Sequence, residues 1–387
     1  MLRLLRNATV YAPEFLGTVD VLIADGRIAA IGRDLPNLPS DLPHTAHDLT
    51  GHLMIPGLID SHVHLTGGGG ESGLSSRVPP MQLTPLTMAG VTSCVGVLGT
   101  DGTTRTIRDL VACTLGLREL GISAWCYTGS YQLPPPTLTG SVRDDIVFVD
   151  PIIGLGELAL SDHRSSQPTL DDVLRVASDV YVAGMISGKS GVVHCHMGSG
   201  PRGFDLLETA LETTEIPARL YHPTHINRER WLFEDAKKLV KRGVTVDLTA
   251  FPDDGETLMA AEAIARWRRE DLPMSQLTCS SDGAGCLPTF DDDGRLIRME
   301  VGEPITLLQA LQTLIAEGEP LDVVLPVFTS NVARVLGLSN KGHVRVGGDA
   351  DLAVLTPTGE LRDLWCNGTL MVHQGEALQT GLFEATS

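Results

Sequence analysis

Two histidines separated by one residue, His62 and His64, are the first side chains in the sequence whose spacing suggests chemistry. They follow an apolar run at 54–60 that predicts a β-strand. Because alternate side chains of a strand point to the same face, both imidazoles can bind one metal ion. Further candidate ligands each follow a β-rich apolar run and precede a polar or glycine-rich turn. They are His196, His225 and Asp282.

The middle of the chain alternates predicted strands with predicted helices, in the rhythm of a (β/α)₈ TIM barrel. We expect its strands at residues 57–64, 91–98, 122–128, 152–158, 191–196, 219–224, 244–250 and 277–281. Amphipathic patterns predict helices between them, for example at 204–214, 228–242 and 257–269. An open doubly wound sheet is the alternative. We favour the barrel because all its strands end at one mouth, where the candidate ligands would meet.

Both ends of the chain contain short β-rich segments separated by turn residues. The expected strands lie at residues 2–5, 21–24, 28–31, 52–55, 352–355 and 369–373. The sequence therefore predicts a small β-sandwich domain built from residues 1–56 and 343–387, joined to a barrel domain at 57–342.

The expected barrel brings the candidate ligands together from four strands. His62 and His64 end the first strand, and the fifth, sixth and eighth strands end at His196, His225 and Asp282. Four imidazoles and a carboxylate can hold two divalent metal ions.

Other histidines are interpreted more conservatively. His194 alternates with His196 and could share its face, His222 is expected to support a ligand, and His163 near the mouth is left without a role. The remaining histidines lie in the terminal β regions and are interpreted as surface or structural residues. They are His44, His47, His52, His343 and His373.

The composition is that of a soluble globular protein, with 42% hydrophobic residues, 41 glycines and 23 prolines. A net charge of −19 argues against nucleic acid as a partner, because phosphates are bound by Lys and Arg. No run of about 18 apolar residues occurs, so we expect no membrane span, and the first residues lack the apolar core of a signal peptide. Seven scattered cysteines without a Cys-x-x-Cys pair favour free thiols in a reducing cytoplasm.

Several short segments together carry a family resemblance. They are His62-Val63-His64 with Gly67-Gly68-Gly69-Gly70-Glu71, Leu98-Gly99-Thr100-Asp101, Ser161-Asp162-His163-Arg164, His196-Met197-Gly198, Pro223-Thr224-His225-Ile226-Asn227-Arg228 and Ser280-Ser281-Asp282-Gly283. Over nearly the whole chain the sequence resembles isoaspartyl dipeptidases, metallopeptidases of the amidohydrolase superfamily. The His-x-His pair and the aspartate of the eighth strand are common to the superfamily. The glycine-glutamate, Ser-Asp-His-Arg and His-x-Asn-Arg segments are much more specific to the dipeptidase.

The resemblance implies a role for each matching residue. His62 and His64 would bind the more buried metal ion, and His196 and His225 the second. Asp282 would bind metal and carry a proton between the reactants. Substrate would be held by Gly69, Gly70, Glu71, Thr100, Tyr131, Arg164 and Arg228. The resemblance also implies a homo-oligomer.

The chain departs from the family at the residue that bridges the metal ions. The family uses a carboxylated lysine there, but the matching position is Glu157. No lysine lies between His64 and Lys189, and Lys189 is roughly 20 Å from the mouth if the intervening stretch is extended. Glu157 falls short of a carboxylated lysine by roughly 3–4 Å, so we expect a bend or bulge at Gly154 and Gly156 that lets Glu157 bridge the ions. The alternative is a solvated or salt-bridged Glu157 and one bound metal ion.

The resulting hypothesis is hydrolysis of the β-aspartyl isopeptide bond in zwitterionic dipeptides. Two divalent metal ions, zinc being the expected element, would hold a bridging hydroxide without a carbamylated lysine. Asp282 would transfer the proton of the attacking hydroxide to the leaving amine, and Tyr131 would donate to the oxyanion. Arg164 and Arg228 offer planar forks for carboxylates.

Two alternatives stay open at this point. Cys286 stands where the family has a substrate-binding serine, and a thiol is a poorer hydrogen-bond donor. Together with Glu157, it allows an amidohydrolase that acts on another carboxylate-bearing amide, such as an N-acyl amino acid or a cyclic amide. The second alternative is a non-catalytic protein that binds a ligand without hydrolysing it.

Overall fold

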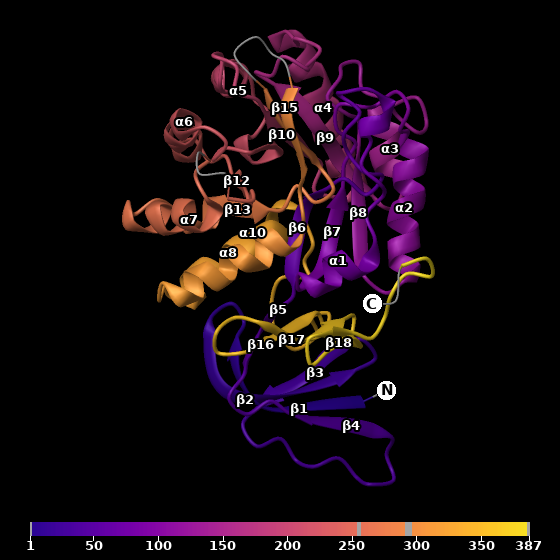
Figure 1. Cartoon of the computed structure of the whole chain (residues 1–387), viewed down its shortest axis with the longest axis vertical. Helices are drawn as coiled ribbons and strands as arrows, with labels where there is room; N and C mark the ends of the chain where they lie inside the picture. The colour runs from indigo at the N-terminus through magenta and orange to yellow at the C-terminus, as the bar shows by residue number, and fades with distance from the viewer. Residues whose placement is uncertain (1, 254–256, 291–295, 385–387) are drawn as a thin grey trace.

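Eight parallel strands form the barrel in the computed structural model, which describes residues 2–253, 257–290 and 296–384 (Figure 1). The strands are β6 (Leu58–Val63), β7 (Val91–Gly96), β8 (Ser123–Thr128), β9 (Ile152–Leu160), β10 (Val192–Met197), β11 (Tyr221–Thr224), β12 (Val246–Thr249) and β13 (Leu277–Ser280). β6 to β11 pair in sequence order, and β12 pairs with β13. The Ile226 amide donates to the Asp247 carbonyl and the His64 amide to the Gly283 carbonyl, which links the two groups of strands at both sides.

Ten α-helices are described around and below these strands. They are α1 (Leu83–Met88), α2 (Ile107–Glu119), α3 (Val142–Phe148), α4 (Leu170–Ser187), α5 (Asp205–Thr213), α6 (Arg230–Lys241), α7 (Ala260–Arg269), α8 (Ile305–Ala316), α9 (Leu321–Val324) and α10 (Ser330–Val335). α2 and α4 begin with capping boxes, Thr106 with Asp109 and Thr169 with Asp172, which satisfy free amide groups of the first turn. α7 begins three residues later than its pattern predicts.

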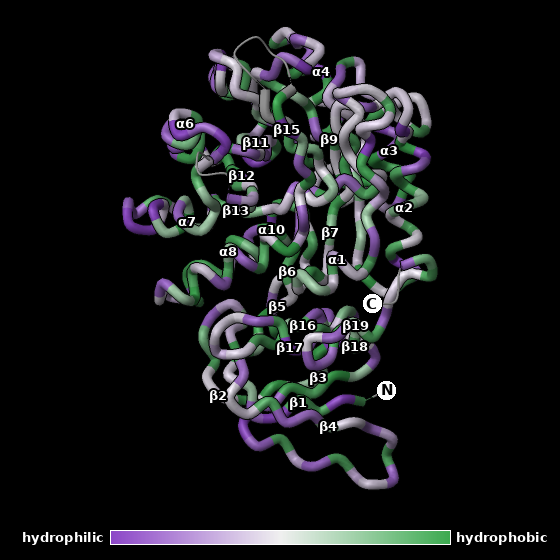
Figure 2. The backbone as a smooth tube through the Cα atoms, viewed as in Figure 1, coloured by the Kyte–Doolittle hydropathy of each residue, from purple (hydrophilic) through white to green (hydrophobic). Residues whose placement is uncertain are grey.

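The barrel strands are buried on both faces. Every residue of β6, β7, β9 and β10 is buried, because helices cover the outside and side chains fill the inside. The outer helices are amphipathic instead. α6 buries Phe233, Ala236 and Leu239 and exposes charged residues between them, and Figure 2 shows it as a mixture of hydrophobic and hydrophilic segments.

Both chain ends build one nine-stranded sheet below the barrel (Figure 1). Its strands are β1 (Leu2–Tyr11), β2 (Phe15–Ala24), β3 (Arg27–Gly32), β4 (His44–Asp48), β5 (Leu53–Pro56), β16 (Leu352–Leu355), β17 (Leu361–Cys366), β18 (Thr369–His373) and β19 (Glu376–Ala377). β5 pairs antiparallel with β16, which joins the two ends of the chain. β16 to β18 lie next to the barrel and β1 to β4 lie farther away, with a separate apolar core that includes Val10, Val21 and Trp365.

A polar cluster around the buried side chains of Lys341 and Asp351, the joint cluster, connects this sheet to the barrel. It consists of Lys341, Asp349, Asp351, Asn367 and Ser123, the first residue of β8. The Lys341 ammonium lies 2.6 Å from Asp351 Oδ2, 2.7 Å from Ser123 Oγ, 2.9 Å from Asp349 Oδ2 and 3.0 Å from Asn367 Oδ1. The terminal sheet is therefore attached to the N-terminal end of the barrel strands, opposite the mouth.

The hairpin of β14 (Cys286–Phe290) and β15 (Leu296–Val301) follows β13 and lies near the mouth (Figure 1). It positions Cys286 directly after the last barrel strand. In the described part of the chain, no helix is both long enough and apolar enough to cross a bilayer.

Candidate metal centre

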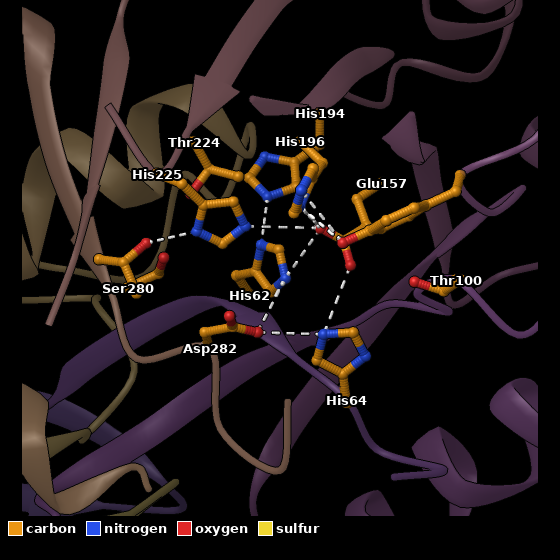
Figure 3. Close-up of polar contacts among 12 residues, drawn as sticks. His62, His64, Thr100, Glu157, His194, His196, Thr224, His225, Ser280 and Asp282 are labelled. Carbon is orange, nitrogen blue, oxygen red and sulfur yellow. Dashed lines mark hydrogen bonds and ion pairs between the residues drawn. The ribbon is translucent and has the colours of Figure 1, made fainter. Parts of the chain in front are cut away.

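Six potential ligands from five strands meet at the mouth of the barrel (Figure 3). All six side chains are buried. They are His62 in β6, His64 just after it, Glu157 within β9, His196 in β10, His225 just after β11 and Asp282 just after β13. The structure thus brings together every ligand that the sequence indicated.

The Glu157 carboxylate occupies the centre of the cluster. Its Oε2 lies 3.3 Å from His62 Nε2, 3.1 Å from His196 Nδ1 and 3.6 Å from His225 Nε2, and its Oε1 lies 3.4 Å from His64 Nε2. Asp282 completes the cluster from the other side, with Oδ1 3.0 Å from His64 Nε2 and 3.4 Å from His62 Nε2. One carboxylate therefore contacts the histidines of both expected metal sites.

A bulge in β9 brings Glu157 to this position. Leu155 pairs with Val193 and Leu158 with Cys195, so two residues of β9 lie opposite one residue of β10. A β-carbon on Gly156 would lie 2.8 Å from the His194 Cβ, closer than real side chains approach. The glycine thus permits the close packing that compensates for the shorter side chain. Lys189 lies far from this position and donates to three carbonyl groups, those of Ile146, Val149 and Ile152.

The ligand atoms of this cluster fit divalent metal ions. Among the described residues, buried atoms without a hydrogen-bond partner include His62 Nε2, His225 Nε2, Glu157 Oε1 and Asp282 Oδ1. Buried polar atoms are normally paired, so this concentration of unpaired atoms indicates a site for a ligand. Nitrogen and carboxylate donors in sets of three are typical of zinc and related ions.

The charges of the cluster are strongly coupled. Burial disfavours the His62 imidazolium, but Glu157 and Asp282 outweigh burial and raise the pKa of His62 to about 9. Burial opposes ionisation of Glu157 too, but the charge of His62 and the neighbouring imidazoles of His196 and His225 hold the pKa of Glu157 well below its ordinary value. The carboxylate is consequently ionised at neutral pH, as a metal ligand must be.

Supporting residues that the sequence analysis did not identify hold the ligands in place. Asp162 Oδ2 lies 3.0 Å from His196 Nε2, and Thr249 Oγ1 lies 2.7 Å from His225 Nδ1. Asp162 belongs to the Ser-Asp-His-Arg segment, so the family resemblance could have indicated it. No sequence pattern indicates Thr249. Partners of this kind fix the orientation of metal-binding imidazoles.

Asp60 links the first and last barrel strands beside the ligands. Its Oδ1 accepts from the backbone amides of Ser281 at 3.1 Å and His62 at 3.3 Å, and its Oδ2 accepts from the Ser281 hydroxyl. Burial raises the pKa of Asp60 to about 6. This residue was also missed, although it stands two positions before His62.

The expected substrate residues form one group beside the metal cluster. The Thr100 hydroxyl donates to Glu71 Oε1 at 2.9 Å, and Arg164 Nη1 lies 3.5 Å from the same oxygen. Cys286 belongs to the same group, and burial together with the neighbouring Glu71 carboxylate raises the pKa of its thiol to about 12. His163, left without a role above, points outward with 71% of its side chain exposed.

The imidazole of His196 is surrounded by three further polar side chains, those of Tyr131, Arg164 and Arg228. The Tyr131 hydroxyl lies 2.8 Å from His196 Nδ1, and both guanidinium groups lie 3.3–3.4 Å from His196 Nε2. Asp162 accepts from Arg164 through Nε and Nη2, and Nη1 lies 3.5 Å from Glu71 Oε1, so two carboxylates hold this guanidinium in place. Within the described residues Arg228 contacts no carboxylate and lies over the ring of Phe251, so its charge is available to a carboxylate of a ligand.

The glycine-rich segment 67–70 is held by Arg105 rather than being a loose loop. The buried guanidinium of Arg105 donates to the carbonyls of Thr66, Gly68, Gly69 and Val78, and to the carboxylate of Asp101. Glycine is required within the segment. A β-carbon on Gly67 would lie 2.0 Å from the Val78 carbonyl oxygen, and one on Gly69, where φ is +76°, 2.5 Å from that of Ser76. Gly70 has a φ of +108° and precedes Glu71.

Comparison with known proteins identifies the family. No protein-family model matches the chain. The chain is 24% identical to an allantoinase of Streptomyces avermitilis over 91% of its own length and 86% of that protein. The dihydropyrimidinase of Brevibacillus agri has a similar fold, with a TM-score of 0.65 and 16% identity over 98% of this chain and 96% of that one. The β-aspartyl dipeptidase of the thermophilic, keratin-degrading Fervidobacterium islandicum AW-1, solved in complex with β-Asp-Leu, is 40% identical with a TM-score of 0.92, over 99% of this chain and 100% of that one. The chain therefore belongs to the β-aspartyl dipeptidase family of amidohydrolases.

Proposed function

We propose that the protein hydrolyses the isopeptide bond of β-aspartyl dipeptides with two divalent metal ions. The observation that carries the proposal is the placement of Glu71, Arg164 and Arg228 beside the buried histidine–carboxylate cluster. A β-aspartyl dipeptide carries one ammonium and two carboxylate groups, and a carboxylate and two guanidiniums are complementary to them. The relative from F. islandicum, with its β-Asp-Leu complex, supports the same substrate class.

The proposed metal ligands fall into two sets that share one residue. His62, His64, Glu157 and Asp282 would hold one ion, and Glu157, His196 and His225 the other. Zinc suits four imidazoles with two carboxylates. When bound, such ions supply Lewis-acid activation of water and of the scissile carbonyl.

Two residues of the chain perform the proton and charge chemistry in this proposal. Asp282 is ionised, because His62 and His64 outweigh burial and hold its pKa below the ordinary value. Asp282 therefore accepts the proton of the attacking water and delivers it to the leaving amine. Burial raises the pKa of Tyr131 well above its ordinary value, so the phenol keeps its proton and donates to the developing oxyanion.

A substrate panel tests the reaction. Zinc-loaded protein should hydrolyse β-Asp-Leu and leave α-Asp-Leu nearly untouched, and a chelator should abolish the activity until zinc is restored. The thiol of Cys286 beside Glu71 favours a second candidate, an amidohydrolase acting on N-acyl amino acids or cyclic amides. Strong turnover of N-acetyl-leucine with negligible turnover of β-Asp-Leu would decide for that candidate.

A matched pair of arginine variants tests the binding side. Arg228→Gln removes the fork beside His196, so KM for β-Asp-Leu should rise about tenfold to a hundredfold, as expected for loss of a hydrogen bond between charged groups. Arg230→Gln, two residues away with its side chain 63% exposed, should leave KM within about twofold. Equal effects of the two variants would contradict the assignment of Arg228.

The free cysteines support a cellular location. All seven cysteines are unpaired, and Cys94, Cys126, Cys195, Cys279 and Cys366 are buried. Free thiols in this number favour a reducing compartment, and we propose the cytoplasm.

A further inference from the structure

We propose that Asp247, which contacts no metal ligand directly, determines which nitrogen of His62 faces the metal site, through a chain of buried hydrogen bonds across the barrel. This relay consists of His62, His194, His222, Thr278 and Asp247. All five side chains are fully buried. The inference rests on the proposed metal centre and assigns a positioning role to four residues below it.

The relay is continuous from strand to strand. His62 Nδ1 lies 2.8 Å from His194 Nε2, and His194 Nδ1 lies 3.0 Å from His222 Nδ1. His222 Nε2 lies 2.9 Å from Thr278 Oγ1, which lies 2.5 Å from Asp247 Oδ1. The five residues belong to β6, β10, β11, β13 and β12, so the relay crosses the barrel interior beneath the ligand cluster. Figure 3 shows His194 next to His62 in the close-up of the centre.

Asp247 sets the direction of every hydrogen bond in the relay. An ionised carboxylate only accepts hydrogen bonds, so the single hydroxyl proton of Thr278 is donated to Asp247. The Thr278 oxygen is then left as an acceptor, and His222 must donate to it from Nε2. Thr224 and Ser280 donate their hydroxyls to the other oxygen of Asp247, Oδ2, at 2.7 and 2.6 Å.

The two central histidines transmit this direction because they are neutral. Burial lowers the pKa of His222 to about 4, although the charge of Asp247 opposes the shift. His194 is fully buried, and its two ring nitrogens lie against the imidazoles of His62 and His222, so no carboxylate lies at either nitrogen to stabilise a second proton. A neutral imidazole that donates from one nitrogen accepts at the other.

The consequence at the metal site follows step by step. His222 donates from Nε2 and accepts at Nδ1, so His194 donates to it from Nδ1 and accepts at Nε2. His62 then donates from Nδ1, so Nε2, which lies next to Glu157 and Asp282, is the nitrogen that would bind a metal ion. Reversal of the relay would place a proton on His62 Nε2, where it would block metal binding.

Neutron diffraction of deuterated, zinc-loaded crystals tests the direction without any measurement of activity. We expect deuterium on His62 Nδ1, His194 Nδ1 and His222 Nε2. Deuterium on His194 Nε2 or His222 Nδ1 would overturn the inference. Because substrate plays no part, the result is independent of whether the protein cleaves β-aspartyl dipeptides.

Zinc affinity, measured by competition with a chromophoric chelator, tests the energetic consequence. Thr278→Val breaks the relay and should weaken zinc binding by about 10–100-fold, the usual effect of losing an outer partner of a metal ligand. Thr278→Ser keeps the hydroxyl and should restore most of the affinity. Thr224→Val is the matched control, since it removes another buried hydroxyl from the same carboxylate outside the relay, and its effect should stay within about threefold. Equal weakening by the two valine variants, or none by Thr278→Val, would refute the relay.

Discussion

Polar clusters of opposite character lie at the two ends of the barrel. In the joint cluster at the N-terminal end, the Lys341 ammonium lies against four oxygen atoms, and the Asp351 carboxylate also accepts from the Asn367 amide at 2.7 Å. At the mouth, His62 Nε2, His225 Nε2 and Asp282 Oδ1 lie buried without hydrogen-bond partners among the described residues.

The two clusters illustrate two roles of polar groups, one in stability and one in ligand binding. An unpaired buried polar atom costs about 1–3 kcal/mol, so a cluster that serves stability alone is expected to pair its atoms. The joint cluster does so and fixes the terminal sheet to the barrel. The mouth leaves ligand atoms without hydrogen-bond partners, which is expected of a site that binds another species.

The largest expected effect comes from removing the shared ligand at the mouth. Glu157→Gln should lower kcat by about 10³-fold or more, since metal-ion catalysis contributes several kcal/mol of transition-state stabilisation. Metal analysis of the purified variant should find fewer than two zinc ions per chain. If the variant keeps two ions and a normal kcat, Glu157 is not a metal ligand.

The wild-type protein offers a companion measurement on the same residue. Metal-free protein should regain full activity with zinc alone, because a glutamate bridge needs no carbamate. A steep rise in activity on adding bicarbonate would contradict the glutamate bridge.

The corresponding change at the joint should affect stability and spare the chemistry. Lys341→Met leaves Asp351 buried without its cation, so the free energy of unfolding should fall by about 3–5 kcal/mol. Urea unfolding measures this loss, and kcat of the folded protein should remain within about twofold because the cluster lies at the opposite end of the barrel. As a control, Lys238→Met, which removes an exposed ion pair with Asp235, should not shift the urea midpoint. A large loss of kcat in Lys341→Met would contradict the assignment of the joint cluster to stability alone.

The smallest effect is expected at the edge of the mouth. Cys286→Ser replaces a thiol beside Glu71 with a stronger hydrogen-bond donor, so KM for β-Asp-Leu should fall about threefold, corresponding to about 0.7 kcal/mol. Cys113→Ser, in α2, is the matched half-buried control and should leave KM unchanged. A rise in KM would indicate that the thiol packs against substrate rather than donating to Glu71.

The barrel could be predicted from sequence because its signals are local. Each of the eight strands was expected within about three residues of its observed bounds, since apolar runs between turn residues are visible along the chain. The strands β4, β14, β15, β17 and β19 were not expected. β4 is His44–Asp48, a polar segment whose strand conformation depends on pairing with β1, and pairing partners are not visible in a local pattern.

The ligand cluster was predictable for a similar reason, and its supports were not. The types and spacing of the four histidines and Asp282 indicate a metal site without any knowledge of contacts, and the family resemblance added Glu157. Thr278 and Asp247 are an ordinary hydroxyl and carboxylate within apolar runs, and only closure of the barrel brings them beneath His62. The bulge at Gly156 was expected because the length of the Glu157 side chain requires it, which is a physical constraint rather than a pattern.

Arg105 orders the glycine-rich segment 67–70, although its glycines alone would favour a flexible chain. Four consecutive glycines have more backbone freedom in the unfolded chain than any other tetrapeptide, and ordering them is correspondingly unfavourable. The guanidinium contacts order them when the protein folds. A molecule arriving at the mouth then meets a rigid backbone, and association requires no further loss of chain entropy there.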